Sequence, residues 1–266
     1  MTEETKGTAP PEKGRRKHAL PHAIALLRSV AYSVTATVFF LVMTACCAFV
    51  VFFPADRMRF LLSWWAAGDL FLLRVLCGQR IEVRGHENIP KDAALVASKH
   101  QAAWETMALV PMLPRGAIIL KKELLRIPIY GWYARYYGMI PVDRAGGTAA
   151  LKKLAVNAAA AAAKGVQILI FPEGTRRMVG APPDYKPGAI FLYDRLAVPM
   201  VPVALNSCVY WPRRRIVRYP GTVVVSFLPP IPPGLNRKEA QHRLQDAIER
   251  ETDRLVAETG YPADRI

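Results

Sequence analysis

His100 and Glu105 are the residues of this sequence best suited to acid–base chemistry. His100 follows an apolar run that ends at Ser98, and Glu105 comes five positions later in a segment of helical character. In one continuous helix, five residues would turn the two side chains about 140° apart. We therefore predict that His100 lies where a strand passes into a helix, so that its ring turns back toward Glu105. A carboxylate in that position would orient the imidazole and stabilise the imidazolium that forms on proton uptake.

The sequence around this pair supplies no nucleophile. It contains no GxSxG segment, and the HxxxxE spacing differs from the HExxH pattern that places two zinc ligands on one helical face. The attacking group is therefore expected to come from a substrate, typically as a hydroxyl. The free N–H groups of the first helical turn are predicted to face a developing oxyanion. The alternative is a buried histidine that closes the end of a strand.

Basic residues follow several of the predicted strands. Arg176 ends the segment FPEGTR, in which Gly174 would let the backbone approach a ligand and the guanidinium would grip a phosphate with two hydrogen bonds. Lys121 and Arg144 end two further strands. One such residue alone is usually a solvated charge. Together with the histidine–carboxylate pair, they indicate an anion site at the carboxyl edge of the sheet, where open α/β sheets bind ligands.

The elements that must position these residues follow from the hydrophobic pattern. Short apolar runs alternate with helical segments after residue 80, which predicts an α/β fold with a mixed β-sheet flanked by helices. The predicted strands are 81–84, 94–98, 116–120, 138–142, 167–171, 199–205 and 222–227. The predicted helices are 102–112, 128–137, 148–164, 187–196 and 237–258.

The first part of the chain predicts a membrane anchor. Residues 1–22 are polar and basic, as in a disordered tail, and residues 23–78 are predicted to form a membrane-anchoring helix pair before the α/β domain of residues 79–266. The uncharged run 29–55 would be about 40 Å long as one helix, which exceeds a bilayer core of roughly 30 Å. The apolar stretch 60–77 carries Asp69 and Arg74, so it is better suited to the membrane interface.

The flanking charges favour a particular topology for this anchor. Lysines and arginines lie before the first helix and after it, so the positive-inside rule favours a hairpin that re-enters the bilayer, with both ends in the cytoplasm. The alternative is a single crossing. We expect the protein in the inner (cytoplasmic) membrane, with its active domain on the cytoplasmic side.

Overall charge and cysteine content restrict the partners. The formal net charge of +15 favours an anionic partner such as an acidic lipid, a nucleic acid or an acidic carrier protein. No motif that recognises a nucleic-acid groove is present, so we expect no nucleic-acid partner. The four cysteines have no CxxC spacing and predict neither a disulfide framework nor a metal site.

Four segments together resemble, in order and spacing, the sequence blocks of the glycerophospholipid acyltransferases. They are His100–Glu105, Gly138–Arg144, Phe171–Arg176 and Val201–Val203. The resemblance covers roughly residues 80 to 230, and it is strongest to the bacterial branch that acylates 1-acyl-sn-glycerol-3-phosphate. It implies that His100 is the general base and that Glu105 orients it. The residues implied to bind the acceptor phosphate are Lys121, Arg144, Glu173, Gly174, Thr175 and Arg176.

The reaction implied by the resemblance is transfer of a fatty acyl group from acyl-CoA or acyl-acyl carrier protein to the sn-2 hydroxyl of the acceptor. The product would be phosphatidic acid, and no metal or redox cofactor is implied. Two positions depart from the family: Lys99 replaces the usual Asn, and Glu105 replaces the usual Asp. One alternative is acyl transfer to another lysolipid, such as lyso-ornithine lipid. Another is a non-catalytic, membrane-anchored binder of anionic lipid, which would use the cluster Arg213–Arg215 with Arg218; such a cluster is usually a solvated face.

Overall fold

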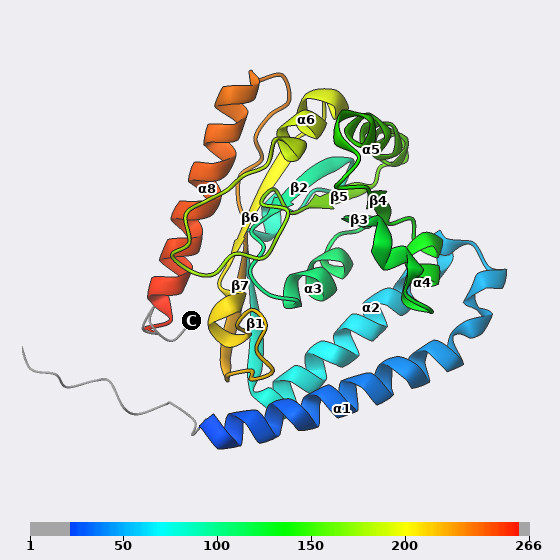
Figure 1. Ribbon diagram of the computed structural model, residues 1–266, viewed down its shortest axis with the longest axis vertical. Coiled ribbons are helices and arrows are strands. Elements are labelled where there is room, and N and C mark those ends of the chain that lie inside the picture. The colour runs from blue at the N-terminus through cyan, green and yellow to red at the C-terminus, as the bar shows by residue number, and fades with distance from the viewer. Residues whose placement is uncertain (1–21, 261–266) are drawn as a thin grey trace, which may run out of the picture.

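A seven-stranded sheet forms the centre of the computed structural model, which describes residues 22–260 (Figure 1). The strand order is β1-β7-β6-β2-β5-β3-β4. Neighbouring strands run parallel except β6 and β7, which are antiparallel. The predicted mixed α/β sheet is therefore confirmed. The predicted disordered tail lies outside the described residues, apart from His22 at the start of α1.

The element bounds follow the predicted ranges closely. The strands are β1 (Gln79–Arg84), β2 (Ala94–Ser98), β3 (Gly116–Lys121), β4 (Ile140–Val142), β5 (Gln167–Ile170), β6 (Met200–Leu205) and β7 (Gly221–Phe227). The helices of the body are α3 (Trp104–Met112), α4 (Tyr130–Tyr136), α5 (Gly147–Ala162), α6 (Pro187–Leu196), α7 (Ser207–Tyr210) and α8 (Arg237–Glu258). The short helix α7 was not predicted. Strand β4 is shorter than predicted because Gly138, with φ of +72°, closes α4 in a left-handed conformation that glycine adopts easily.

The sheet has an apolar layer on each face. Along β2, Val96 packs with α3 and the N-terminal helices, whereas Leu95 and Ala97 pack with α5, α6 and α8. This alternation follows from the two-residue period of a strand. Because both faces are covered, the central strands are apolar throughout, which explains why their positions could be predicted from uninterrupted apolar runs.

Helix α8 lies along one edge of the molecule and is well specified by its sequence (Figure 1). Asn236 caps it by accepting a hydrogen bond from the backbone N–H of Glu239 at 2.9 Å. Ala240, Leu244 and Ile248 are buried at intervals of four residues and face the sheet. This packing fixes the position of the neighbouring polar residue Glu249.

The N-terminal helices form a hairpin, as predicted. Helix α1 spans His22–Cys46, and α2 (Ala55–Leu72) continues into a π-helical turn, Leu73–Cys77. The apolar run 29–55 is therefore not one helix, because the chain turns through the 3-10 helix Ala48–Phe52 before Pro54 precedes α2. Among the described residues, His22–Cys46 and Met58–Cys77 are long and apolar enough to cross a membrane, and only 11% and 22% of their most apolar windows are buried.

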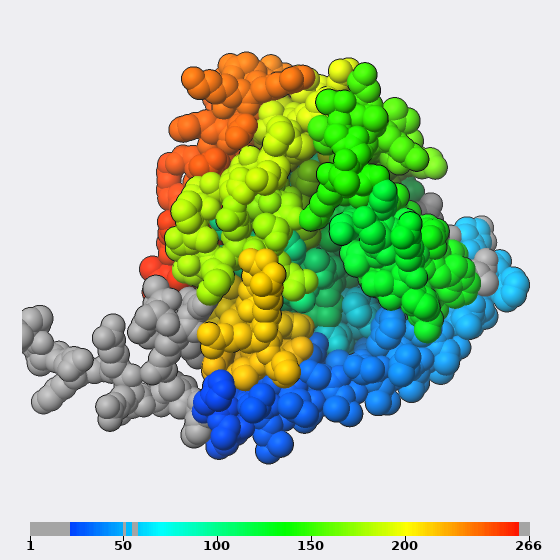
Figure 2. Space-filling view, viewed as in Figure 1, coloured from blue at the N-terminus to red at the C-terminus, as the bar shows by residue number. Residues whose placement is uncertain are grey.

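The hairpin contacts the body at both ends (Figure 2). At one end, the Arg218 guanidinium lies over the rings of Tyr32 and Trp211, at 4.4 Å and 4.1 Å from their centroids, and its backbone N–H donates to Ser29. Arg218 is therefore not part of a solvated basic face, although Arg214 and Arg215 are exposed. These ring contacts stabilise a desolvated cation at the junction.

At the other end, α4 holds the turn of the hairpin. The hydroxyl of Tyr133 donates to the carbonyl of Thr44 at 3.3 Å, and that of Tyr136 donates to the carbonyl of Phe53 at 2.7 Å. The hairpin is thus held at both ends, and between them α2 packs against α3. The outer side of both helices remains exposed.

Candidate active site

His100 and Glu105 lie together at the end of β2, where the chain passes into α3. Nδ1 of His100 is 3.8 Å from Oε2 of Glu105, a separation too long for a hydrogen bond but within the range of an ion pair. Glu105 is fully buried and the His100 side chain is 12% exposed. The predicted strand-to-helix junction therefore brings the two residues together with the ring at the surface and the carboxylate behind it.

Glu105 is held by backbone and side-chain donors. It accepts hydrogen bonds from the backbone N–H of Gln101 at 3.0 Å and from that of Ala102 at 2.8 Å and 3.0 Å. The hydroxyl of Ser207, on α7, donates to the same carboxylate at 2.5 Å. These hydrogen bonds hold the carboxylate in one orientation behind the His100 ring.

This network bears on one prediction about the start of the helix. We expected the free N–H groups of the first helical turn to face an oxyanion, and this stays a prediction for α3, which begins at Trp104. The N–H groups of Gln101 and Ala102, which precede α3, cannot take part because Glu105 is long enough to fold back and occupy them. Glu105 therefore positions the loop that carries His100 as well as its ring.

The imidazole of His100 is fixed by stacking. Its ring lies 4.0 Å from the ring of Phe171, centroid to centroid, with an angle of 16° between the planes. Nδ1 of His100 is buried and has no hydrogen-bond partner among residues 22–260. The contact with Phe171 joins the end of β2 to the end of β5, which is its neighbour in the sheet.

The loop after β5 carries four of the six predicted phosphate-binding residues, Glu173 to Arg176. Gly174 has φ of +64°, a conformation that other residues adopt only under strain, and its carbonyl accepts a hydrogen bond from Arg144 at the end of β4. Thr175 is exposed. Arg176 is half-buried and makes no hydrogen bond or ion pair within the part of the chain that the structure describes. A half-buried guanidinium without a carboxylate partner is suited to an anionic ligand.

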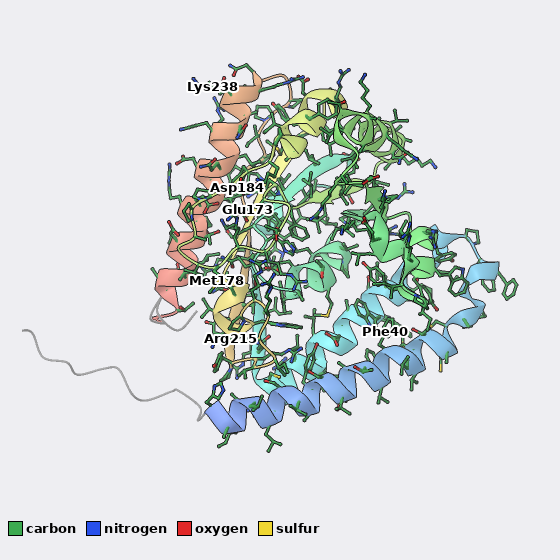
Figure 3. All side chains as sticks on the ribbon, viewed as in Figure 1. Phe40, Glu173, Met178, Asp184, Arg215 and Lys238 are labelled. Atoms are coloured by element: carbon green, nitrogen blue, oxygen red, sulfur yellow. The ribbon has the colours of Figure 1, made fainter. Side chains whose placement is uncertain are left out.

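Glu173 lies behind this loop rather than on its surface. Its side chain lies in the interior of the molecule (Figure 3). Oε1 of Glu173 is 3.0 Å from Nζ of Lys99. Burial raises the pKa of the Glu173 carboxyl, and the Lys99 ammonium opposes this shift. The geometry favours a supporting role for Glu173 over the direct contact with the acceptor that the resemblance implies.

Lys121 lies at the same edge of the sheet but further from the group around His100. It ends β3, is exposed, and is 3.8 Å from Glu123. Its neighbour Lys122 pairs with Asp143, and this ion pair lowers the pKa of that carboxyl. The structure thus connects Arg144 to the loop of residues 171–176, but no contact joins Lys121 to it.

Sequence reasoning missed four residues that support the pair. They are Lys99, Phe171, Ser207 and Glu249. Lys99 was recognised only as a departure from the family pattern. Ser207 follows the segment Val201–Val203, and its position after a buried strand was the available signal. The contribution of Glu249 depends on how α8 packs, which no local pattern reveals.

Comparisons with known proteins identify the family of this chain. A family model described as Acyltransferase matches residues 80–206. A 1-acyl-sn-glycerol-3-phosphate acyltransferase of Pseudomonas aeruginosa is 39% identical over 173 residues, which cover 65% of this chain and 67% of that protein. The human 1-acyl-sn-glycerol-3-phosphate acyltransferase alpha is 31% identical over 61% of this chain, which spans 59% of the human protein.

A solved structure shows the same fold. The 1-acyl-sn-glycerophosphate acyltransferase PlsC from Thermotoga maritima superimposes with a TM-score of 0.71 and 25% identity, covering 87% of this chain and 95% of that one. The chain therefore belongs to the acyltransferase family that includes the 1-acyl-sn-glycerol-3-phosphate acyltransferases.

Proposed function

We propose that this enzyme transfers a fatty acyl group from an acyl thioester to the sn-2 hydroxyl of 1-acyl-sn-glycerol-3-phosphate, giving phosphatidic acid. The observation that carries the proposal is the His100–Glu105 pair, with an N–O separation of 3.8 Å, beside a loop that bears the unpaired Arg176. The relatives from Pseudomonas aeruginosa and human are 1-acyl-sn-glycerol-3-phosphate acyltransferases, which supports this acceptor. The family residues lie at the carboxyl ends of the adjacent strands β2 and β5, where one substrate can contact both.

In the proposed mechanism, His100 removes the proton from the acceptor hydroxyl as its oxygen attacks the thioester carbonyl carbon. A C–O bond forms, the C–S bond breaks, and the imidazolium returns the proton to the leaving thiolate, so His100 ends the cycle neutral. With Nδ1 facing Glu105, Nε2 is the nitrogen that exchanges the proton, and the carboxylate stabilises the imidazolium. This chemistry requires no cofactor other than the acyl co-substrate.

The acceptor phosphate is assigned to the basic residues at the strand ends. Arg176 is the principal ligand because its guanidinium is not engaged elsewhere in the described chain. Arg144 holds the carbonyl of Gly174 and so shapes the loop, with Thr175 at its exposed tip. Lys121 is a second, more distant cation for the same phosphate or for the acyl donor.

The hairpin supports a reaction at a membrane surface. An apolar cavity of about 200 Å³ lies between the hairpin, α3 and α4. Phe40 and Trp65 from the hairpin and Met107 and Tyr130 from the body are among its lining residues. A lipid acceptor would enter from the bilayer, and acyl-CoA or acyl-acyl carrier protein from the aqueous side. We propose the inner membrane, with residues 79–266 as one catalytic domain in the cytoplasm.

The basic cluster gives little support to a non-catalytic lipid binder, since Arg218 is used within the molecule. A turnover assay decides between the functions. The purified full chain, in mixed micelles, is incubated with labelled palmitoyl-CoA or palmitoyl-acyl carrier protein and one of two acceptors: 1-acyl-sn-glycerol-3-phosphate or lyso-ornithine lipid. We expect phosphatidic acid from the first acceptor and none with His100→Ala. Lipid binding without any turnover would contradict the proposal, and turnover of lyso-ornithine lipid alone would reassign the acceptor.

A further inference from the structure

A buried ionic cluster lies directly behind the candidate active site. Lys99, the residue before His100, is 3% exposed, and its Nζ is 3.0 Å from Glu173 Oε1 and 2.7 Å from Glu249 Oε1. A second hydrogen bond joins Nζ to Glu249 Oε2 at 2.8 Å. The cluster therefore connects the end of β2, the loop after β5 and helix α8 through one ammonium group.

The cluster is completed by a phenol and a backbone group. The Tyr185 hydroxyl donates to Glu249 Oε1 at 2.8 Å, and burial raises the pKa of this phenol, so it stays protonated. The nearby backbone N–H of His100 lowers the pKa of the Glu173 carboxyl slightly, although Glu173 Oε2 is buried without a hydrogen-bond partner among the described residues, so Lys99 is the group that holds this carboxylate. These are the charged, titratable and backbone groups that the structure shows acting on Glu173: Lys99 from β2, Glu249 from α8, Tyr185 from the segment before α6, and the His100 amide.

Burying these charges is unfavourable unless each has a partner. Lys99 has three N–H donors, and the contacts to two carboxylates use all of them. The two carboxylates outweigh the single ammonium, so the charge of Glu173 depends on Lys99. Because burial already raises the pKa of Glu173, its ionised form would be lost more easily without Lys99.

We propose that Lys99 is a positioning residue for acyl transfer: it keeps Glu173 ionised, so that the loop of residues 171–176 stays aligned with His100. The inference rests on the proposed function. The same two segments also meet where the Arg177 N–H donates to the His100 carbonyl at 2.8 Å and where Phe171 stacks on the imidazole. Misalignment would therefore displace the base and Arg176 together, because one short loop carries both the stacking ring and the phosphate ligand.

The proposal predicts opposite pH shifts from two substitutions in one cluster. Lys99→Met removes the cation that favours ionised Glu173, and Glu249→Gln removes an anion that opposes it. In mixed micelles containing labelled palmitoyl-CoA and 1-acyl-sn-glycerol-3-phosphate, kcat is measured from about pH 5 to about pH 9. The midpoint on the acid side of the kcat–pH profile should move to a pH about one unit higher in Lys99→Met. It should move to a pH about half a unit lower in Glu249→Gln. At neutral pH, Lys99→Met should reduce kcat about tenfold and raise KM for 1-acyl-sn-glycerol-3-phosphate roughly fivefold, because the base and Arg176 are displaced together, with KM for palmitoyl-CoA within about twofold.

Two controls separate this mechanism from others. Asp246→Asn removes a carboxylate from the same helix at a position that is 49% exposed and paired with Arg250, and its profile should match the wild type. Lys99→Met and Glu249→Gln also change the electrostatic potential at His100 itself. Both substitutions are therefore repeated in a Glu173→Gln background, where no ionised Glu173 remains. The shifts should disappear there, and shifts that persist would overturn the proposal because the effect would then act directly on His100.

A second measurement does not depend on turnover. Hydrogen exchange of the amides in residues 171–177 should be at least about tenfold faster in Lys99→Met than in the wild type, and unchanged in Asp246→Asn. If Lys99→Met does not fold, Glu249→Gln decides the matter: an acid limb that stays at the wild-type pH, or moves upward, overturns the proposal. If the wild-type enzyme acylates none of the acceptors, the proposed function fails. Independently of turnover, wild-type hydrogen exchange of residues 171–177 in Lys99→Met would refute the positioning role.

Discussion

Ser207 and Glu105, which are 102 residues apart in sequence, are joined by a hydrogen bond of 2.5 Å from the serine hydroxyl to the carboxylate. The contact exists because β2 and β6 are neighbours in the sheet, so the segments that follow them lie side by side. Ser207 thus supplies the only side-chain hydrogen bond to Glu105 among the described residues. The other donors belong to the backbone before α3.

The first prediction follows from this contact. Ser207→Ala should lower kcat roughly tenfold, because a hydrogen bond to a charged group is worth about 1.5–3 kcal/mol and its loss leaves Glu105 less well fixed. KM for both substrates should change little, because Ser207 lies behind the carboxylate. Ser226→Ala, at another buried serine, is the matched control and should retain wild-type kcat. A Ser207→Ala enzyme with wild-type kcat would show that Glu105 needs no side-chain donor.

His100→Ala tests the base itself. Loss of the general base should reduce kcat by at least about 100-fold. Circular dichroism and membrane sedimentation should be unchanged, since the ring stacks on Phe171 at the surface of the site rather than in the core. Turnover at the wild-type rate in His100→Ala would remove the base assignment and, with it, the proposed mechanism.

Substitutions of Glu105 separate the effect of its charge from the effect of its side-chain length. Glu105→Gln keeps the shape but removes the charge that favours imidazolium, so kcat should fall strongly while acceptor KM changes little. Glu105→Asp restores the acid more common in the family but is one methylene shorter, and the present network is built around glutamate through Gln101, Ala102 and Ser207. We expect an activity between those of Glu105→Gln and the wild type. If kcat is lower in Glu105→Asp than in Glu105→Gln, the length of the side chain matters more than its charge.

Arg176→Ala tests the phosphate assignment. A lost charge-assisted contact is worth about 1.5–3 kcal/mol, so kcat/KM for 1-acyl-sn-glycerol-3-phosphate should fall roughly 10- to 150-fold, mainly through KM. Arg176→Lys should recover only part of this loss because lysine lacks the bidentate fork. Arg195→Ala, at a guanidinium that lies over the Phe191 ring, is the control and should leave kinetics unchanged. Wild-type KM and kcat/KM in Arg176→Ala would refute the assignment.

The fold could be predicted from sequence because its signals are local. The central strands are buried on both faces, so they appear as uninterrupted apolar runs, and helix α8 carries a cap and a regular apolar stripe. The turn of the hairpin was less predictable. Residues 47–54 are as apolar as the helices beside them, so hydropathy alone gave no boundary before Pro54.

The long-range contacts that hold the catalytic residues in place could not be predicted in the same way. The positions of His100, Glu105 and Arg176 followed from single segments, and their proposed roles rest on the family resemblance. The contacts of Lys99 with Glu249 and of Ser207 with Glu105 join segments whose proximity depends on strand order and on the packing of α8. One misleading local signal was the run of arginines before Arg218, which suggested a solvated face and concealed the packing of Arg218 between two aromatic rings.

The native cysteines provide a test of the hairpin topology. Cys46 is exposed at the end of α1, near the turn, whereas Cys77 and Cys208 are buried. The adjacent Cys47 is partly exposed and is replaced by alanine, so that labelling reports Cys46 alone. If the hairpin re-enters the bilayer, lipid covers Cys46, and a membrane-impermeant maleimide should label it from neither side. Ala257→Cys, at an exposed position on α8, should be labelled only in inverted vesicles if the body lies on the cytoplasmic side, as the charges flanking the hairpin predict. Detergent should make both positions reactive, which confirms that each thiol is competent. Labelling of Cys46 from outside would show that α1 crosses the membrane completely. Labelling of Ala257→Cys in intact spheroplasts would put the catalytic domain outside the cytoplasm, contrary to the topology that the charges flanking the hairpin predict.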